Sequence, residues 1–390
     1  MRTTLPALLL LVCVSFTYAQ PVPRMQLDNP LAGFSITVPE DWTMATGRAG
    51  NVEIAIDAPT GATLALQPAL WFFYAPKPPA QEAQTLARDL TLLGGGAKAV
   101  ATATGRANEW EVRMQSSGVR GPLIERWLCR LEGDRSYVIG AFGRPGNYEQ
   151  FQGDLDTALQ SCHLIALAPR TFFREPSENA YRMSLPVGWK WEGQIYRDMA
   201  TPGYFVWKVQ SPQGATGAFS SPPAAFNIAV PYTPAGQTAR LMVLPHLRQE
   251  MPDIRLEGVH ELPRAGATAM AMIRGAGLGK NPRVNVVLAD YVGTYRGNAV
   301  RLRATLVTWM LDQSALLGGR GNWFLNASGA WGPINDFDQQ YALGRAVVAS
   351  VRTDPRWRAN QRNVTEGVIN DRNDAIEKWG IEWDELIREY

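Results

Sequence analysis

A short stretch that occurs twice constrains this chain more than any other feature. The sequence FSITVPEDW spans residues 34–42 and YRMSLPVGW spans 181–189, so each residue of the second stands 147 positions after its counterpart. In both, apolar and polar residues alternate up to a proline, which is the period of a half-buried strand. The proline ends the strand because it cannot donate to the ladder. The shared apolar positions are Phe34 and Tyr181, Ile36 and Met183, Val38 and Leu185, and Trp42 and Trp189.

The segments that follow the two strands also match. The turns DAPTGAT at 57–63 and QSPQGAT at 210–216 both place Pro and Gly as in a tight hairpin turn. A helix is then predicted over about 81–93, where three glycines stop it, and another over about 237–249. We expect Pro245 to kink the second helix.

Further alternating segments predict strands, and an amphipathic helix closes each unit. The closing helices begin at Tyr148 and Phe337, which are 189 positions apart, so the second unit has gained 42 residues. Much of the gain is assigned to a glycine-rich loop over 311–336. The predicted strands are 110–115, 127–131 and 137–142 in the first unit, and 267–273, 284–290 and 299–310 in the second.

This order of strand, hairpin, helix, meander and closing helix resembles the PsbP/Mog-like fold. The two repeated stretches, the two Gly-Ala-Thr turns and the closing helices carry the resemblance, over 29–168 and 172–357. It implies an α+β fold of two tandem similar domains, each a mainly antiparallel sheet flanked by helices, the second with the insertion at 311–336. The superfamily includes PsbP subunits of photosystem II, a Ran-binding factor and bacterial envelope proteins. Most members are non-catalytic binding and assembly proteins, so a binding role is implied.

Residues 358–390 lie outside both predicted domains. Apolar residues including Trp379 and Trp383 recur there at helical spacing, which predicts a C-terminal amphipathic helix. Its apolar stripe is expected either to pack on the second domain or to enter the groove of a partner or of another copy of the chain. Tryptophan is enriched at binding hot spots, so both residues are candidate contact residues.

The first 19 residues read as a secretory signal. Arg2 supplies the positive charge, residues 5–16 form an apolar core, and small residues precede a cut after Ala19. The apolar run is too short for a permanent membrane anchor. Lipidation of Cys13 is disfavoured because Val12, rather than a small residue, precedes it. We therefore expect an extracytoplasmic protein, periplasmic or secreted, with no transmembrane segment.

Removal of the signal leaves two cysteines, and an oxidising compartment permits a bridge between them. Cys129 shares a predicted strand face with Trp127, and Cys162 lies on the apolar face of the first closing helix. If those two surfaces meet, a Cys129–Cys162 disulfide is expected. The alternative is a pair of buried free thiols.

Several kinds of chemistry find no support in the sequence. The formal net charge is +2 without a block of like charge, so nucleic-acid binding is not expected. The three histidines have no partner at a metal-ligand spacing, and no phosphate loop or GxSxG elbow is present. The carboxylate pairs Glu40–Asp41 and Asp154–Asp156 are assigned to a turn and to a solvated helix face. No metal or cofactor is predicted.

Trp323, Phe324 and Trp331 stand out because they fall in the predicted glycine-rich loop. They are expected either to contact a ligand or to pin the loop to its domain. The sequence thus favours an exported, non-catalytic binding or assembly protein of the cell envelope. Its partner, an envelope protein or a small ligand, would be contacted through the second domain and the tail. The alternative is an envelope hydrolase acting on glycan or peptide. The oligomeric state is not indicated.

Export gives the first testable prediction. Mass spectrometry of the mature protein should find Gln20 at the N-terminus, because the small residues before it suit signal peptidase. A chain that keeps Met1 and stays in the cytoplasm would contradict the prediction.

Overall fold

The structure is a computed structural model that describes residues 23–46, 54–57, 69–94, 97–117, 121–198, 201–221, 224–226, 230–275, 282–310 and 323–361. It is an α+β fold in which the strand pairs of the described residues are antiparallel. The predicted signal, most of the predicted 57–63 turn and the predicted tail beyond residue 361 lie outside the described residues, whereas residues 355–361 are helical.

The first half of the molecule, β1 to β10, is built on a seven-stranded sheet with the order β3-β4-β5-β9-β8-β7-β6. Its strands are β3 (Thr43–Thr46), β4 (Ile54–Asp57), β5 (Ala69–Tyr74), β6 (Val100–Ala103), β7 (Glu109–Ser116), β8 (Leu123–Glu132) and β9 (Arg135–Gly143). Helix α1 covers one face, and the other face packs on α2, α3 and a small sheet of β1, β2 and β10. These covering elements are α1 (Pro79–Leu93), α2 (Pro145–Gln150), α3 (Gln152–Ser161), β1 (Arg24–Asn29), β2 (Phe34–Pro39) and β10 (His163–Leu164).

The second half, β11 to β21, repeats this plan with the order β13-β14-β15-β20-β19-β18-β17, and β16 pairs with β20. Its sheet consists of β13 (Lys190–Asp198), β14 (Thr201–Gln210), β15 (Gly217–Ser220), β16 (Ala224–Phe226), β17 (Arg255–Glu261), β18 (Arg283–Tyr295), β19 (Asn298–Met310) and β20 (Trp323–Pro333). The other elements are β11 (Arg170–Arg174), β12 (Tyr181–Pro186), β21 (Arg352–Thr353), α4 (Ala235–Thr238), η1 (Ala239–Val243), α5 (Leu244–Leu247), α6 (Pro263–Gly275), η3 (Ile334–Asp336) and α7 (Phe337–Ala349).

The repeated sequence stretches form β2 and β12, which occupy the same place in the two halves. Each is the middle strand of its three-stranded sheet, between β1 and β10 or between β11 and β21. In each half a serine of the closing-helix turn accepts a hydrogen bond from this strand. The Thr37 amide donates to Ser161 Oγ, and the Ser184 amide donates to Ser350 Oγ, both at 2.9 Å. The closure of strand and helix is therefore the same in both halves.

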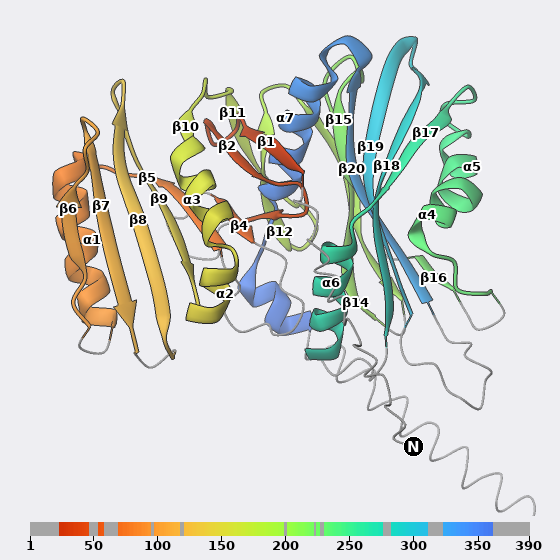
Figure 1. The fold of residues 1–390 in the computed structure, drawn as a ribbon. Helices are drawn as coiled ribbons and strands as arrows, with labels where there is room; N and C mark the ends of the chain where they lie inside the picture. Colours follow the sequence, from red (N-terminus) through yellow and green to blue (C-terminus); the bar gives the residue numbers. More distant parts are fainter. Residues whose placement is uncertain are drawn as a thin grey trace, which may run out of the picture.

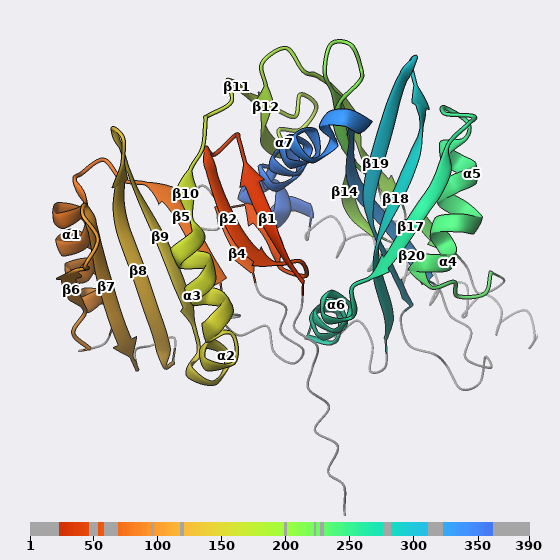
Figure 2. The ribbon, with the colours of Figure 1, turned by 45° about the horizontal axis from the view of Figure 1, so that its top comes forward.

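The two halves lie side by side with their closing elements toward each other. Figure 1 shows α1 and the α4–α5 segment at opposite ends of the molecule and α7 between the two sheets. Figure 2 shows α6 below β1 and beside the lower ends of the strands of the second sheet, in the same middle region. Leu31 of the first half packs in the core of the second, Ala349 packs in the core of the first, and Arg170 donates to the Leu31 carbonyl at 2.6 Å.

Two predictions about the second half are wrong. Residues 263–275 form helix α6 rather than a strand over 267–273, because the alternation there is made of alanines, and alanine is the best helix former. Residues 323–333 form β20 rather than part of a loop, since they pair along their whole length with β19. The added length of the second half thus includes α6, which has no counterpart in the first, and a longer β19–β20 hairpin.

The predicted helices of both halves are otherwise observed. Helix α1 ends at the predicted glycines, and the helix expected over 237–249 is divided into α4, the π-helical turn η1 and α5. The wide turn comes immediately before Pro245, which lacks an N–H and would clash with the carbonyl four residues earlier in a regular helix. The proline therefore explains why this helix is irregular.

The predicted disulfide is absent: Cys129 and Cys162 are both buried free thiols. Successive residues of β8 point to opposite faces of the sheet. Cys129 packs in the cluster under α1, whereas its neighbour Leu128 packs in the cluster that contains Cys162. The sheet itself therefore separates the two thiols. Burial raises the pKa of both, to about 12 for Cys129, so neither is an activated nucleophile.

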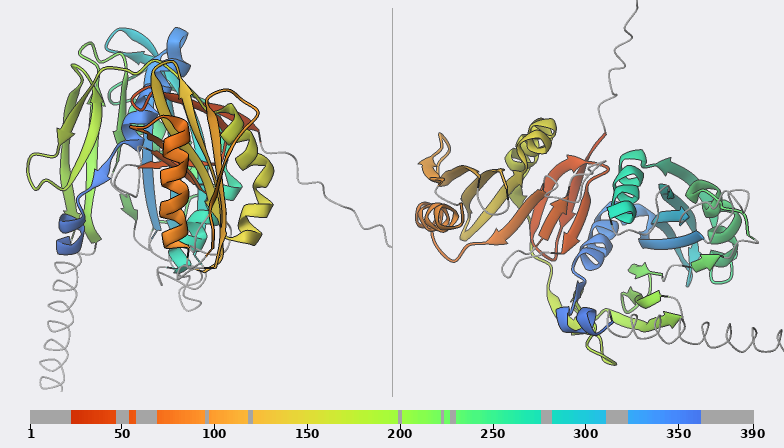
Figure 3. Two further views of the ribbon diagram at one scale, coloured as in Figure 1. Left: turned by 90° about the vertical axis from the view of Figure 1, so that its left-hand side faces the viewer. Right: turned by 90° about the horizontal axis from the view of Figure 1, so that it is seen from below.

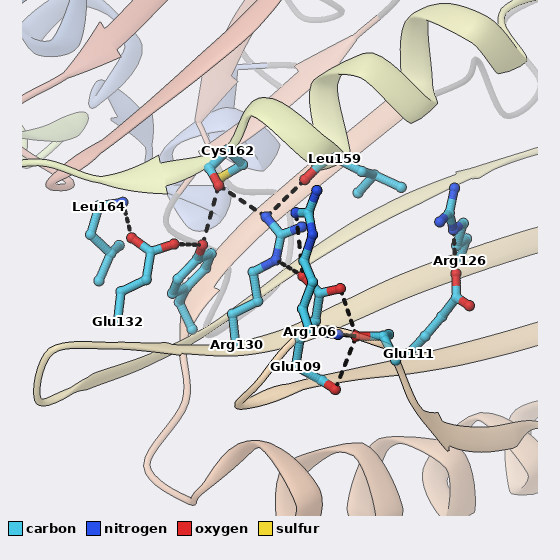
Figure 4. A network of polar contacts seen from close by, with 11 residues as sticks. Arg106, Glu109, Glu111, Arg126, Arg130, Glu132, Leu159, Cys162 and Leu164 are labelled. Atoms are coloured by element: carbon cyan, nitrogen blue, oxygen red, sulfur yellow. Dashed lines mark hydrogen bonds and ion pairs between the residues drawn. The ribbon is translucent and has the colours of Figure 1, made fainter.

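Arg130 of β8, on the Leu128 face, ties the end of α3 to the sheet (Figure 4). Its guanidinium donates to the carbonyls of Leu159 and Cys162, at 2.9 Å each, and pairs with the buried Glu109. Tyr137 also donates to the Cys162 carbonyl and to Glu132. Two carbonyls at the helix end, which have no partner inside the helix, are satisfied in this way.

Replacement of Arg130 by Met should lower the free energy of unfolding by about 3–5 kcal/mol, because the buried Glu109 loses its closest charge partner and the carbonyls of Leu159 and Cys162 lose their donor. Chemical denaturation measures the change. Arg88→Met is the matched control: Arg88 pairs with Asp89 on the exposed face of α1, and its loss should cost less than about 1 kcal/mol. Equal, small losses in both variants would contradict this account of the network.

Candidate functional site

A cavity of about 800 Å³ lies between the sheet of the second half and the η1–α5 segment. Its walls are mainly apolar and come from both sides. The lining side chains include Phe219, Leu302, Leu325, Ala327 and Trp331 from the sheet, and Met242, Val243, Leu247 and Met251 from the helical segment and the turn after it. Figure 2 shows how α4 and α5 stand over the sheet on this side.

The corresponding face of the first half is filled. Trp71 lies edge-on to Phe142 there, with ring centroids 4.6 Å apart, and Trp127 stacks on Phe142 at 6.1 Å. Ala83 and Ala87 of α1 belong to the same core cluster. In the second half the lining of β19 and β20 includes alanines, and the helix above it is divided by the π turn. The space between sheet and helix is therefore filled by side chains in the first half and left open as a cavity in the second.

Trp331 forms a fixed side of the cavity. Its indole N–H donates to the Gly214 carbonyl at 3.1 Å, and its ring lies edge-on to Tyr295 at 6.0 Å. The ring covers Gly217, where an added Cβ would come within 2.2 Å of it. Because the residue is only 5% exposed and held at both ends, it is a preorganised wall rather than a mobile loop contact.

Lys208 places one positive charge at the cavity. Its Nζ donates to Tyr295 Oη at 2.9 Å and to Glu250 Oε2 at 3.1 Å, and it lies over the rings of Tyr295 and Trp331. Burial alone would lower the pKa of Lys208, but its hydrogen bonds to Tyr295 and Glu250 outweigh burial and raise it. The lysine is therefore charged, and the Glu250 side chain that neutralises it is 64% exposed.

Of the aromatic residues singled out from the sequence, Trp323, Phe324 and Trp331 lie on strand β20, and only Trp331 of these lines the cavity. Trp323 shares the cavity-side core but is fully buried, stacked on Phe226 at 4.0 Å, and donates to the Val230 carbonyl. Phe324 points to the other face and stacks on Trp309. Trp379 and Trp383 lie outside the described residues. The sequence analysis did not identify Met242, Leu247 and Met251 as cavity-lining residues. The methionines and leucines in the predicted helix and just after it were the signal that could have indicated an apolar wall.

The described ranges contain neither a metal-binding cluster nor a helix that could cross a membrane. In that part of the chain, no three His, Cys, Asp or Glu side chains gather closely enough to hold a metal ion. None of the helices described has the length and apolar character needed to cross a membrane.

The chain was compared with known families and solved structures. No family description matches it, and no curated protein matches its sequence. The PsbP protein CyanoP from Synechocystis is similar in structure over 38% of this chain and 95% of its own, with 9% identity and a TM-score of 0.29. LpqN, involved in cell envelope biogenesis of Mycobacterium tuberculosis, is similar over 37% and 91%, with 13% identity and a TM-score of 0.29. TplEi, a T6SS immunity protein from Pseudomonas aeruginosa, is similar over 85% and 97%, with 11% identity and a TM-score of 0.22.

Lys208 should contribute little to stability. Lys208→Met is expected to change the free energy of unfolding by less than about 1 kcal/mol, because its carboxylate partner is mostly in water. The comparison is Arg303→Met, which removes the partner of the buried Asp290 and should cost several-fold more. Denaturation curves of both variants test this, and a large loss for Lys208→Met would mean that the charge is structural.

Proposed function

We propose that this protein is an exported, non-catalytic binding protein of the cell envelope, and that the cavity of the second half holds an apolar ligand. The observation that carries the proposal is the cavity itself, which has a volume of about 800 Å³ and mainly apolar walls with a minority of polar side chains. Ligand sites in proteins usually have this size and composition. The filled counterpart in the first half supports a ligand role, because the fold does not need the hollow.

The proposal includes the architecture. The chain would consist of two PsbP/Mog-like units in tandem, over 29–168 and 172–357. The identical strand orders, the equivalent places of β2 and β12 and the matched hydrogen bonds of Ser161 and Ser350 support it. Under this proposal the first unit has a filled interior and the second unit holds the ligand.

The alternative of an envelope hydrolase gains no support from the cavity. Two serines line it, but the hydroxyl of Ser221 exchanges hydrogen bonds of 3.0 Å with the Ala327 backbone rather than with a histidine. A hydroxyl used in this way is not set up for nucleophilic attack. Contact through Trp379 and Trp383 of the tail stays a prediction.

Filling the cavity should abolish ligand binding. The probe is N-phenyl-1-naphthylamine, an apolar dye that fluoresces in dry sites. Ala327→Phe on β20 adds a ring to the cavity wall, and its dye affinity should fall at least about tenfold, the equivalent of roughly 1.4 kcal/mol. Ala299→Phe is the matched control, since Ala299 is exposed on the neighbouring strand β19 and does not line the cavity.

Thermal unfolding of both variants shows whether each is folded. Undiminished dye binding by a folded Ala327→Phe protein, or no binding by the wild type, would overturn the proposed function. Displacement of the dye by alkyl alcohols of increasing chain length then measures how much apolar chain the cavity accepts.

A further inference from the structure

A second cavity, of about 1080 Å³, lies between the two halves. Helix α7, helix α6 and strands β18 to β20 line it from the second half, and β1 with the turn after β2 lines it from the first. Figure 3 shows α6 and α7 next to each other where the first-half strands approach. Unlike the apolar cavity beside α5, this cleft contains charged side chains of both halves.

A comparison of the two halves shows that this cleft has a positive charge at a position where the first half has a negative one. In the first half, Arg126 of β8 pairs with Glu111 on the neighbouring strand and with Asp156 on the closing helix α3. In the second half, Arg303 of β19 likewise pairs across strands, with Asp290 at 2.7 and 3.0 Å. The residue 189 positions after Asp156 on the closing helix is Arg345. An arginine therefore stands where the first half has the carboxylate.

Arg345 has no carboxylate partner among the described residues. Its only polar contact there is with Met25 Sδ at 3.5 Å, and its guanidinium lies 5.6 Å from the centre of the Tyr341 ring. Arg303 lies 5.3 Å from the centre of the same ring. Two guanidinium groups thus share one tyrosine, and the Tyr341 hydroxyl makes no hydrogen bond with a described residue. Because Asp290 already pairs with Arg303, Arg345 is the guanidinium that is left to bind an anion beside Tyr341.

The acidic groups of the cleft do not cancel this charge at Tyr341. Asp41 pairs with Arg264 of α6 at 2.7 Å, and Asp290 is already bound to Arg303. Burial raises the pKa of Tyr341, while Arg345 and Arg303 lower it more strongly than Asp290 and Glu40 raise it. Asp28, Glu40 and Asp338 also line the cleft, and none of these described carboxylates pairs with Arg345. Arg345 therefore keeps its charge beside the hydroxyl.

We propose that the cleft between the halves is a second ligand site, which binds a small organic anion through Arg345 and the Tyr341 hydroxyl. The anionic group is a carboxylate or a phosphate, because both offer the oxygens that a guanidinium and a hydroxyl bind. The remaining walls suit an apolar body: Leu262, Val286, Leu288, Val307 and Val348. A ligand here touches both halves of the molecule.

The test uses two dyes that differ in charge. Anilinonaphthalene sulfonate carries an anionic group, whereas N-phenyl-1-naphthylamine has the same rings without it. Arg345→Met should weaken binding of the sulfonate dye at least about tenfold, since hydrogen bonds from a guanidinium to an anionic group are roughly twice as strong as those between neutral groups. Tyr341→Phe should weaken it several-fold. Neither change should affect the neutral dye. Arg182→Met, an exposed arginine on β12, is the control for the loss of one charge.

Arg345→Asp separates binding from folding. It gives the second half the carboxylate that the first half has at this position, so the melting temperature should be kept while binding of the sulfonate dye is lost. Displacement by hexanoate and by hexyl phosphate then distinguishes the two anionic groups, and inorganic phosphate tests whether the apolar body is needed.

Sulfonate-dye binding that is unchanged in both Arg345 variants would overturn the proposal. Binding that is lost in Ala327→Phe but kept in Arg345→Met would overturn it too, because the anion would then sit in the cavity beside α5. Loss of neutral-dye binding alone leaves this inference standing and counts only against the proposed function.

Discussion

Both large sheets are apolar on their two faces, and the rest of the structure follows from the need to cover four faces. Each Å² of exposed apolar surface costs about 25 cal/mol, so an uncovered face is a large penalty. The first half meets the need with α1 on one side and with α3 and the β1–β2 pair on the other. The second half uses the same kinds of cover, but η1 and α5 do not fill the space beneath them. The cavity arises because the helical segment still covers the sheet, while the side chains between them do not fill the space.

Local periodicity carried much of the fold prediction. The repeated strand with its proline and tryptophan, helix α1 and both closing helices depend on patterns within about fifteen residues, which packing reinforces. Trp42 is buried in the first half, whereas Trp189 is only half-buried in the second. Strand β20 was missed because its glycines suggested a loop. They are required by packing instead: a Cβ on Gly329 would meet the Arg303 carbonyl at 2.4 Å, and one on Gly332 would meet Gln340 at 2.6 Å.

The site was less predictable than the fold because it depends on residues that the chain brings together from afar. No pattern near Lys208 indicates that Tyr295 and Glu250 will meet it. The disulfide failed for a related reason, since a shift of one residue along a strand moves a side chain to the other face of the sheet. The unpaired arginine is different. Its signal was present in the sequence, as Asp156 in the first half and Arg345 in the second. Matching these two charges has meaning only once the arginines that they face are known.

Pro245 has a mechanical consequence for the wall of the apolar cavity. Because proline has no N–H, the helix carbonyls before it lack one backbone partner, and the π turn spreads the neighbouring hydrogen bonds over five residues instead of four. A helical segment that lacks one backbone hydrogen bond is more compliant at that point than an unbroken helix such as α1. The cavity therefore has a rigid sheet on one side and a more compliant helical segment on the other. Its width can adapt to ligands of different size while the strands keep their register.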